Sequence, residues 1–279
     1  MLSLGGAVGP RRYRGVVRPG YEERSPQGPL QPWSPCAWVR RAPDTGATSA
    51  RVVPDGCTDL LWRRGELEIA GPDTGHRDVL LAPGELIVGV RLRPGAARPL
   101  LGDTPATAVA DAQPGLRDLW GEAALRLSDS LARAREPWQI AAGLAAALRD
   151  RMAAYEPDRV AVAVADALDR PRPPGIASLA WELGYSERHL RRRVRAATGY
   201  GPKTLEQILR FRRTMEAVAP VRVPGPTEAR VPDWSRIAAE QGYADQAHLS
   251  RQVRRWAGAS PRALVKPGPT RRGSSTPAA

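Results

Sequence analysis

The sequence predicts an α+β protein: a β-rich N-terminal domain followed by an all-α domain that holds two helix-turn-helix units. Three observations predict this class. Short apolar runs alternate with turn residues between about 50 and 100, Ala- and Leu-rich helical periodicity begins after Trp120, and one pattern of residues occurs twice near the C-terminus. We expect domain boundaries at 1–156 and 157–266, with a disordered tail at 267–279.

The β-rich part follows from the spacing of apolar runs and turn signals. Residues 1–50 are rich in Pro, Gly and Arg, which indicates an irregular arm that becomes ordered around Trp33 and Trp38. After this arm, strands spaced at ~8–12 residues, with Pro-Asp-Gly and Pro-Gly turns between them, favour a small barrel or sandwich. The expected strands are Arg51–Val53, Thr58–Trp62, Glu66–Ala70, Asp78–Ala82 and Leu86–Arg93.

Helices are predicted next. Apolar residues recur every fourth position from Ile140 to Met152, as on one face of a helix. Asp158 is placed to cap a second helix, which buries Val164 and Leu168 and ends before the Pro-rich stretch 171–175. We expect these helices to pack against the β part, and a dimer contact is the alternative.

Charge separates the two parts of the chain. The formal net charge is +13, from 42 basic and 29 acidic residues. Residues 1–170 hold 22 Arg and 21 acids, whereas residues 171–279 hold 20 basic residues and 8 acids. The second part therefore suits a polyanion. No run of ~20 apolar residues predicts a membrane span, no secretory signal is evident, and two cysteines exclude a disulfide framework. We expect a cytoplasmic protein.

The repeat covers residues 179–202 and 237–261. In each copy an apolar residue and Ala precede a Gly-Tyr pair, an N-cap (Ser186 or Asp245) and a His-Leu pair; Val, Gly and Pro follow that Leu at +4, +9 and +12. Two short helices joined by a glycine turn explain the pattern, with Leu and Val buried on the second helix. This unit is a helix-turn-helix, whose second helix can enter a DNA major groove. His189 and His248 are expected to serve local packing or capping.

The outward face of each second helix supplies the candidate DNA-binding residues. A stripe of arginines in the first unit would repel itself in a free helix and becomes favourable beside phosphates and guanine edges. The second unit is less charged and better suited to base reading, since Gln can pair with adenine. The candidates are Arg188, Arg191, Arg192 and Arg195 in the first unit and Gln246, Ala247, Ser250, Arg251 and Arg254 in the second.

The double unit resembles the AraC/XylS family of bacterial transcription regulators. Residues 242–251, Gly-Tyr-Ala-Asp-Gln-Ala-His-Leu-Ser-Arg, and 258–261, Gly-Ala-Ser-Pro, carry the resemblance. It implies a long helix between the units, here Pro202 to Ala217, and recognition helices about one DNA turn, ~34 Å, apart. The Pro-rich segment 219–233 is longer than is usual in that family. It either bulges outward or loosens the coupling between the units, which would alter the half-site spacing.

The N-terminal half resembles an uncharacterised domain that precedes this module in some members. Residues 53–60, 71–72, 89–96 and 119–121 carry that resemblance. It implies a cupin-like β sensor domain with no known ligand. A small-molecule effector is therefore expected, without a cofactor. The candidate effector-binding residues are Asp55, Asp59, Arg91 and Arg93. The two aspartates could bind a polar effector or serve turn formation and capping. The two arginines could line a pocket for an anionic effector or lie in solvent.

The sequence gives little support for a metal site, a reactive thiol or an enzyme active site. His76 is the sole histidine of the N-terminal half, too few for a metal-binding cupin. Cys57 is expected to be a small buried residue at the start of a strand rather than a reactive thiol. No catalytic constellation is recognised, so we expect no enzyme.

The sequence thus predicts an effector-responsive, sequence-specific regulator that binds double-stranded DNA. A second copy of the chain and RNA polymerase are candidate partners. A non-specific architectural DNA binder is the main alternative, and an enzyme with a DNA-targeting tail is a weaker one.

Overall fold

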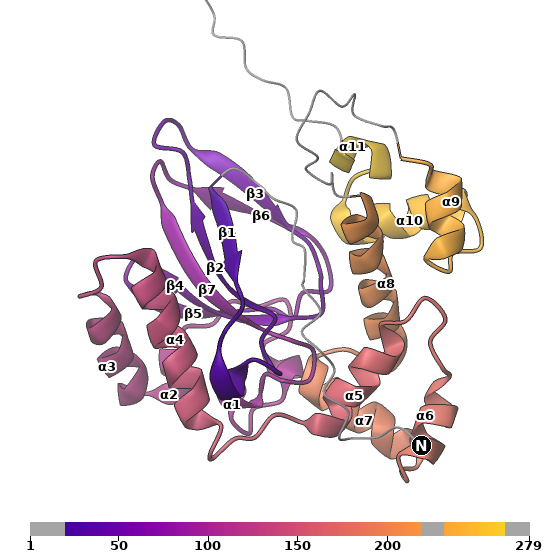
Figure 1. Cartoon of the computed structure of the whole chain (residues 1–279), viewed down its shortest axis with the longest axis horizontal. Coiled ribbons are helices and arrows are strands. Elements are labelled where there is room, and N and C mark those ends of the chain that lie inside the picture. Colours follow the sequence, from indigo (N-terminus) through magenta and orange to yellow (C-terminus); the bar gives the residue numbers. More distant parts are fainter. Residues whose placement is uncertain (1–19, 219–231, 266–279) are drawn as a thin grey trace, which may run out of the picture.

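A curved five-stranded antiparallel sheet forms the centre of the N-terminal half (Figure 1). The computed structural model describes residues 20–218 and 232–265. The sheet order is β1-β2-β7-β4-β5, and β3 pairs with β6 in a separate two-stranded sheet. The strands are β1 Tyr21–Arg24, β2 Cys36–Arg41, β3 Thr48–Val52, β4 Thr58–Arg63, β5 Glu66–Ala70, β6 Arg77–Leu81 and β7 Leu86–Leu92.

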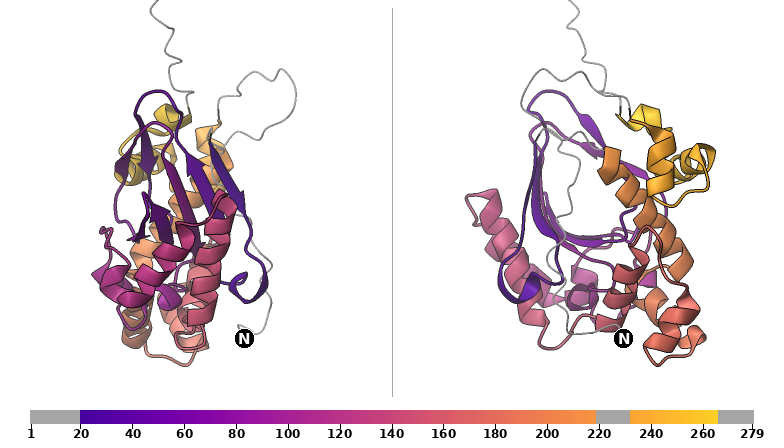
Figure 2. Two further views of the ribbon diagram at one scale, coloured as in Figure 1. Left: turned by 90° about the vertical axis from the view of Figure 1, so that its left-hand side faces the viewer. Right: turned by 45° about the vertical axis from the view of Figure 1, so that its right-hand side comes forward.

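Helices cover the convex face of the large sheet, and the helical half of the chain lies on its concave side (Figure 2). On the convex face Leu60, Val88 and Val90 are fully buried against Leu144 and Leu148. These helix residues belong to the predicted four-residue repeat, so that helix packs on the sheet as expected. The helices of this half are α1 Arg98–Leu101, α2 Arg117–Trp120, α3 Glu122–Leu131 and α4 Pro137–Arg151, with the 3-10 turns η1 Gly28–Leu30 and η2 Ala106–Ala108.

The five strands predicted between residues 50 and 100 are all present, within a few residues of the expected bounds. Two strands were not predicted, β1 and β2, in the region expected to be irregular. β2 lies between β1 and β7 and contributes Ala37 and Val39 to the convex core. Its Cys-Ala-Trp-Val run is too short to show a period, and pairing with β7 makes it a strand.

The C-terminal half has its own hydrophobic core. Helix α5 caps as predicted, since the Asp158 carboxylate accepts a hydrogen bond from the Ala161 amide at 2.9 Å. The long helix α8 spans Pro202–Val218, one residue more than predicted. Its buried residues, among them Leu205 and Leu209, belong to one core with residues of both repeats, and α8 packs against α7 and α10. The helices are α5 Arg159–Leu168, α6 Ile176–Glu182, α7 Glu187–Thr198, α8, α9 Trp234–Glu240, α10 Gln246–Ala257 and α11 Pro261–Val265.

The predicted fold class is therefore confirmed: a strand-rich half precedes an all-α half with two helix-turn-helix units. The Pro-rich segment 219–233 falls mostly outside the described residues. The tail 267–279 and residues 1–19 of the N-terminal arm fall wholly outside them. Among the described residues, no helix is both long enough and apolar enough to cross a membrane.

Candidate nucleic-acid interface

The two repeats form the same local structure. Helices α6 and α7 make the first unit, and α9 and α10 make the second. The predicted N-caps both hold: Ser186 Oγ accepts from the His189 amide at 3.3 Å, and Asp245 Oδ1 accepts from the His248 amide at 2.5 Å. These contacts satisfy amides at the start of each second helix and fix where it begins.

Leucine and valine hold each second helix against its unit. Leu190 and Val194 of α7 are fully buried, as are Leu249 and Val253 of α10. Each pair is spaced by four residues and so lies on one side of its helix. The opposite side of each helix is left facing solvent, where the predicted DNA contacts lie.

Three of the four candidate arginines of α7 are exposed and make no ion pair with any described residue: Arg188, Arg192 and Arg195. Arg191 is also exposed, and it pairs with Glu187 one turn before it, with Nε 2.8 Å from Oε1. An exposed pair at this spacing contributes only a few tenths of a kcal/mol, so Arg191 can exchange this partner for a phosphate at little cost.

Arg193, the neighbour of these arginines in the sequence, has a different place. Its Nε donates to both carboxylate oxygens of Asp158, at 2.8 and 3.0 Å, and Nη1 donates to the Tyr185 hydroxyl at 3.1 Å. The Asp158 hydrogen bond is the main reason that the pKa of Arg193 is raised. This half-buried arginine ties α7 to the N-terminus of α5.

The second recognition helix presents fewer charges. Gln246, Ala247, Arg251 and Arg254 are exposed, and Ser250 is half-buried. Neither Arg251 nor Arg254 makes an ion pair within the described part of the chain.

Gln246 is held by a neighbour. Its Oε1 lies 3.1 Å from the Ser235 hydroxyl of α9. A bidentate contact with adenine uses both the oxygen and the nitrogen of the amide. Gln246 Oε1 can accept a second hydrogen bond, so the contact with Ser235 positions the side chain without preventing this pairing.

Both histidines serve local structure, as predicted. His189 packs on Tyr185, with ring centroids 5.2 Å apart. His248 packs edge-on against Tyr243 at 5.4 Å, and its Nδ1 accepts from the Ala244 amide at 3.3 Å.

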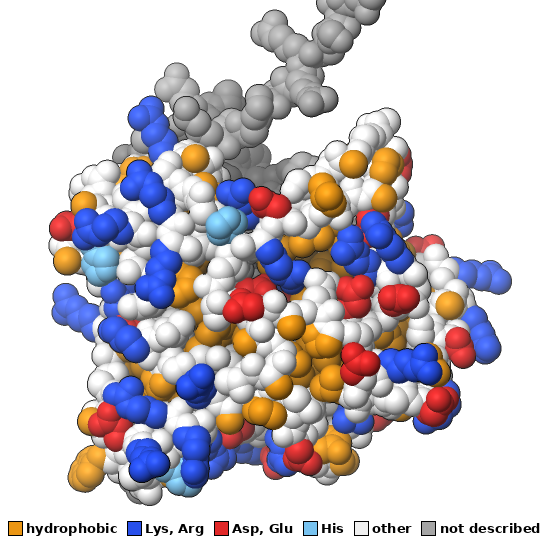
Figure 3. All heavy atoms as spheres, turned by 180° about the vertical axis from the view of Figure 1, so that it is seen from behind, with side chains coloured by type: hydrophobic (Ala, Val, Ile, Leu, Met, Phe, Trp, Pro, Cys, Tyr) orange, Lys and Arg blue, Asp and Glu red, His pale blue; other side chains and the backbone are white. Residues whose placement is uncertain are grey.

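Basic side chains gather over the helical half, on the left side of the view in Figure 3.

One exposed residue of the helical half is not among the candidates chosen from the sequence: Trp181 of α6 is 84% exposed. Aligning the two repeats would have found it, because the corresponding residue of the second unit is Ala239.

The structure brings together three of the four candidate effector residues. Arg91 Nε lies 3.2 Å from Asp59 Oδ1 and 3.6 Å from Asp55 Oδ2, and the Trp38 indole donates to Asp59 at 2.8 Å. Burial raises the pKa of Asp59, and Arg91 opposes that rise. Arg93 lies apart from this group.

Arg93 joins the two halves of the molecule. It pairs with Asp166 of α5, and its Nη1 donates to the Pro32 carbonyl at 3.2 Å.

Asp55 also has a local role, because its Oδ1 accepts a hydrogen bond from the Cys57 amide at 2.8 Å and shapes the turn before β4. Cys57 is buried as expected, and burial raises the pKa of its thiol.

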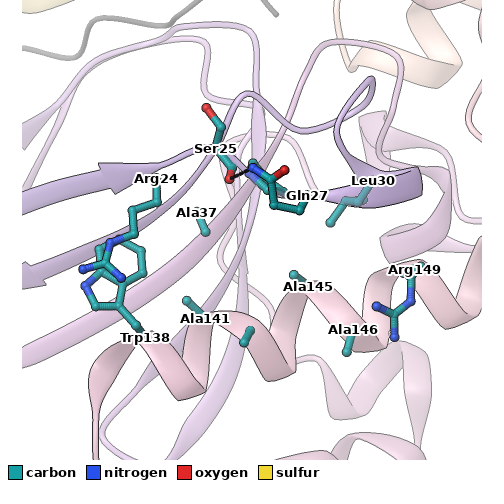
Figure 4. A pocket seen from close by; sticks show the side chains of 12 residues that line it. Arg24, Ser25, Gln27, Leu30, Ala37, Trp138, Ala141, Ala145, Ala146 and Arg149 are labelled. Carbon is teal, nitrogen blue, oxygen red and sulfur yellow. Dashed lines mark hydrogen bonds between the residues drawn. The ribbon is translucent and has the colours of Figure 1, made fainter.

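A cavity of 320 Å³ lies elsewhere in the N-terminal half, between the segment after β1 and helix α4 (Figure 4). Alanines of α4 line it, and Arg24, stacked over the Trp138 ring at 4.0 Å, and Arg149 stand at its edges. None of the four candidate effector residues lines this cavity. Within the described ranges, no group of three or more His, Cys, Asp or Glu residues is placed to hold a metal ion.

Two family models match the chain. Residues 179–266 match a helix-turn-helix domain, and residues 22–114 match a domain of unknown function, DUF6597. No curated protein matches the chain.

Crystal structures of ToxT from Vibrio cholerae are remotely similar. ToxT from strain O395 has 11% identity and a TM-score of 0.42, over 89% of this chain and 98% of that one. An apo variant from strain SCE256 has 11% identity and a TM-score of 0.43, over 82% and 96%. The wild-type protein bound to an unsaturated fatty acid has 10% identity and a TM-score of 0.37, over 81% and 93%. The two domains of the chain are identified by the two family models.

Proposed function

We infer that this chain, with an AraC-type helix-turn-helix domain at its C-terminus and a DUF6597 domain at its N-terminus, is a DNA-binding transcription regulator. The resemblance seen in the repeated residues is thereby confirmed. Our proposal goes further: α7 and α10 enter successive major grooves and read a specific sequence.

One observation carries this proposal. The two recognition helices present exposed arginines that no acid of the described chain neutralises: Arg188, Arg192 and Arg195 on α7 and Arg251 and Arg254 on α10. Ordinary solvated helix faces mix both signs of charge, whereas this arrangement is stabilised by phosphates and by guanine O6 and N7. We propose that α7 supplies affinity, and that Gln246 and Arg251 of α10 supply more of the discrimination.

The test is selection of bound sequences from a random DNA pool with the full chain at ~150 mM salt. Recovery of one motif with two elements about one helical turn apart supports the regulator. Tight, salt-sensitive binding without enrichment would instead favour the architectural DNA binder. Arg126→Ala, which removes an exposed arginine from α3, is the control for a general loss of charge.

We also propose that the N-terminal half is a sensor domain, divided from the DNA-binding domain near residues 156 and 157. Separate hydrophobic cores on either side of this point support the division. A homodimer and contact with RNA polymerase remain predictions.

The effector site we propose is the group formed by Asp55, Asp59 and Arg91. Arg91 already faces two carboxylates, so a polar or cationic effector fits this group better than an anionic one. A panel of small polar compounds can be screened by thermal unfolding. A stabilising compound that loses its effect in Asp59→Asn would support the site, and one that keeps its effect would place the effector elsewhere.

A further inference from the structure

Both recognition helices end at a glycine, and the β-rich half packs against both. Gly199 after α7 has φ 81°, and Gly258 after α10 has φ 66°. A Cβ atom on Gly199 would stand 2.3 Å from Pro72 Cγ. On Gly258 it would stand 2.3 Å from Cε1 and Nε2 of His76. A side chain at Gly199 would overlap the Pro72 ring, and one at Gly258 would require the His76 imidazole to move, so the two surfaces are in direct contact at both glycines.

Pro72 and His76 belong to one short connection. We call residues 71–76, between β5 and β6, the bridging loop. Its Asp73 carbonyl accepts a hydrogen bond from the buried Tyr200 hydroxyl at 2.6 Å, next to Gly199. Beside Gly258, Nη1 of Arg51 on β3 donates to the Ala257 carbonyl at 3.2 Å. The β-rich half thus contacts each unit through packing at its closing glycine and through a hydrogen bond, which comes from Tyr200 to the bridging loop in the first unit and from Arg51 of β3 in the second. The 3-10 turn η2 also packs against α7.

The bridging loop is itself braced by the β-rich half. The Asp111 carboxylate accepts from both the amide and the hydroxyl of Thr74, each at 2.5 Å. The Asp111 amide in turn donates to the Pro72 carbonyl at 3.0 Å. Because these hydrogen bonds hold the bridging loop against the β-rich half, the loop in turn holds the residues that it contacts in a defined position.

These contacts leave the candidate DNA-binding residues free. The bridging loop meets the C-terminal ends of α7 and α10, whereas exposed candidates such as Arg188, Arg192, Gln246 and Arg251 lie nearer the N-termini or along the middle of the helices. Contact with the loop and exposure of the recognition faces therefore coexist in one structure.

We propose that the bridging loop sets the separation and relative orientation of the two recognition helices, and so selects the half-site spacing that the protein accepts. Within the chain, the units are joined through α8 and the segment after it. Both units also pack on α8, and a second attachment of both to one braced loop further restricts how they move relative to each other. His76 and Tyr200 are then positioning residues. The effect on half-site spacing rests on the proposed DNA binding, whereas the effect on the separation and orientation of the two helices does not require DNA.

The first experiment measures the structural part directly. Spin labels on cysteines placed at the exposed Glu182 of α6 and Ala239 of α9 report the distance between the units, since native Cys36 and Cys57 are buried. The full chain should give a narrow distance distribution. His76→Ala combined with Tyr200→Phe removes the imidazole and the hydroxyl and should broaden or shift it. Gly75→Ala, which adds a methyl to the same loop in open space, is the matched control.

The second experiment measures affinity for the selected DNA site with one base pair added to or removed from the segment between the half-sites. The full chain and the Gly75→Ala control should prefer the native spacing. In the double variant that preference should fall roughly tenfold, because the His76 packing contact and the Tyr200 hydrogen bond are both lost. Affinity for an isolated half-site should stay the same.

An unchanged distance distribution in the double variant would overturn the proposal, whatever happens with DNA. Unchanged spacing preference would overturn its consequence for DNA even if the distances changed. Failure of the full chain to select any DNA site is a different result, because it rejects the proposed function while the distance measurement still decides the role of the loop.

Discussion

The two helix-turn-helix units share a framework and differ in what they present to solvent. The residues they share build the unit: the N-caps Ser186 and Asp245, buried Leu and Val at the same spacing, and a closing glycine. On the outward face Arg188 corresponds to Ala247 and Arg191 to Ser250. The comparison teaches that the repeat preserves the positions that folding requires and varies those available for recognition.

The turn between helices differs as well. From the turn glycine to the N-cap, the first unit has one intervening residue, Tyr185, and the second has two, Tyr243 and Ala244. The added residue brings an added amide, and His248 Nδ1 accepts a hydrogen bond from it at 3.3 Å. His189 of the first unit therefore packs on a tyrosine ring, whereas His248 of the second unit packs on a tyrosine ring and also accepts a hydrogen bond.

The largest expected effect tests the shared framework. Leu190→Ala and Leu249→Ala should each lower the free energy of unfolding by ~2–5 kcal/mol, because both side chains are fully buried. Denaturant unfolding of the two variants measures this. Leu80→Ala makes the same change at a side chain that is 72% exposed and should have little effect. A large cost in one unit alone would break the equivalence of the two frameworks.

The outward faces should differ in what they do for DNA. Arg192→Ala and Arg251→Ala remove corresponding residues, and each should cost ~1–3 kcal/mol of binding if it reads a base. A phosphate contact would instead weaken all sequences alike and reduce the salt slope by ~1. We expect relaxed specificity at one position for Arg251→Ala and a more uniform loss for Arg192→Ala. Competition binding against single-base variants of the site separates these outcomes, and the reverse assignment would contradict the division of labour.

A third prediction concerns the arginine that turns inward. Arg193 corresponds to Gln252 of the second unit, which accepts instead from Trp256 Nε1 at 3.1 Å. Arg193→Gln loses the charged bond to Asp158 and should lower stability by ~1 kcal/mol. Thermal unfolding measures this, with Arg191→Gln as the control for an exposed ion pair. If Arg193→Gln and Arg191→Gln both left thermal unfolding unchanged, the hydrogen bonds between Arg193 and Asp158 would contribute nothing to stability.

The smallest effect distinguishes the two histidines. His248→Ala removes the acceptor of the exposed Ala244 amide, which water can partly replace, and should cost ~0.5 kcal/mol. His189→Ala loses only ring packing on an exposed side chain and should cost less. His248→Asn offers another acceptor and should recover part of the loss. If both alanine variants behaved alike in denaturant unfolding, the longer turn would not depend on its histidine.

Local pattern predicted much of this fold because the relevant interactions are local. The strands after residue 50 follow turn residues, and the N-caps Asp158, Ser186 and Asp245 bond amides three residues ahead. β1 and β2 escaped prediction because pairing with distant β7 places β2 inside the sheet. The candidate DNA-binding residues were chosen by helical spacing. Arg193, which lies off that stripe, turns inward to Asp158.

By itself, the sequence determined which segments become helices and strands, that one unit occurs twice, and which residues of each recognition helix face outward, since short-range hydrogen bonds and periodic burial govern all of these. Only the tertiary structure decided the partners of charged residues. Arg91 faces two aspartates, Arg93 pairs with Asp166 across the two halves, and His76 lies against Gly258. The partners in these contacts are distant in the sequence or lie on different elements, so they depend on how the sheet and the helices pack together.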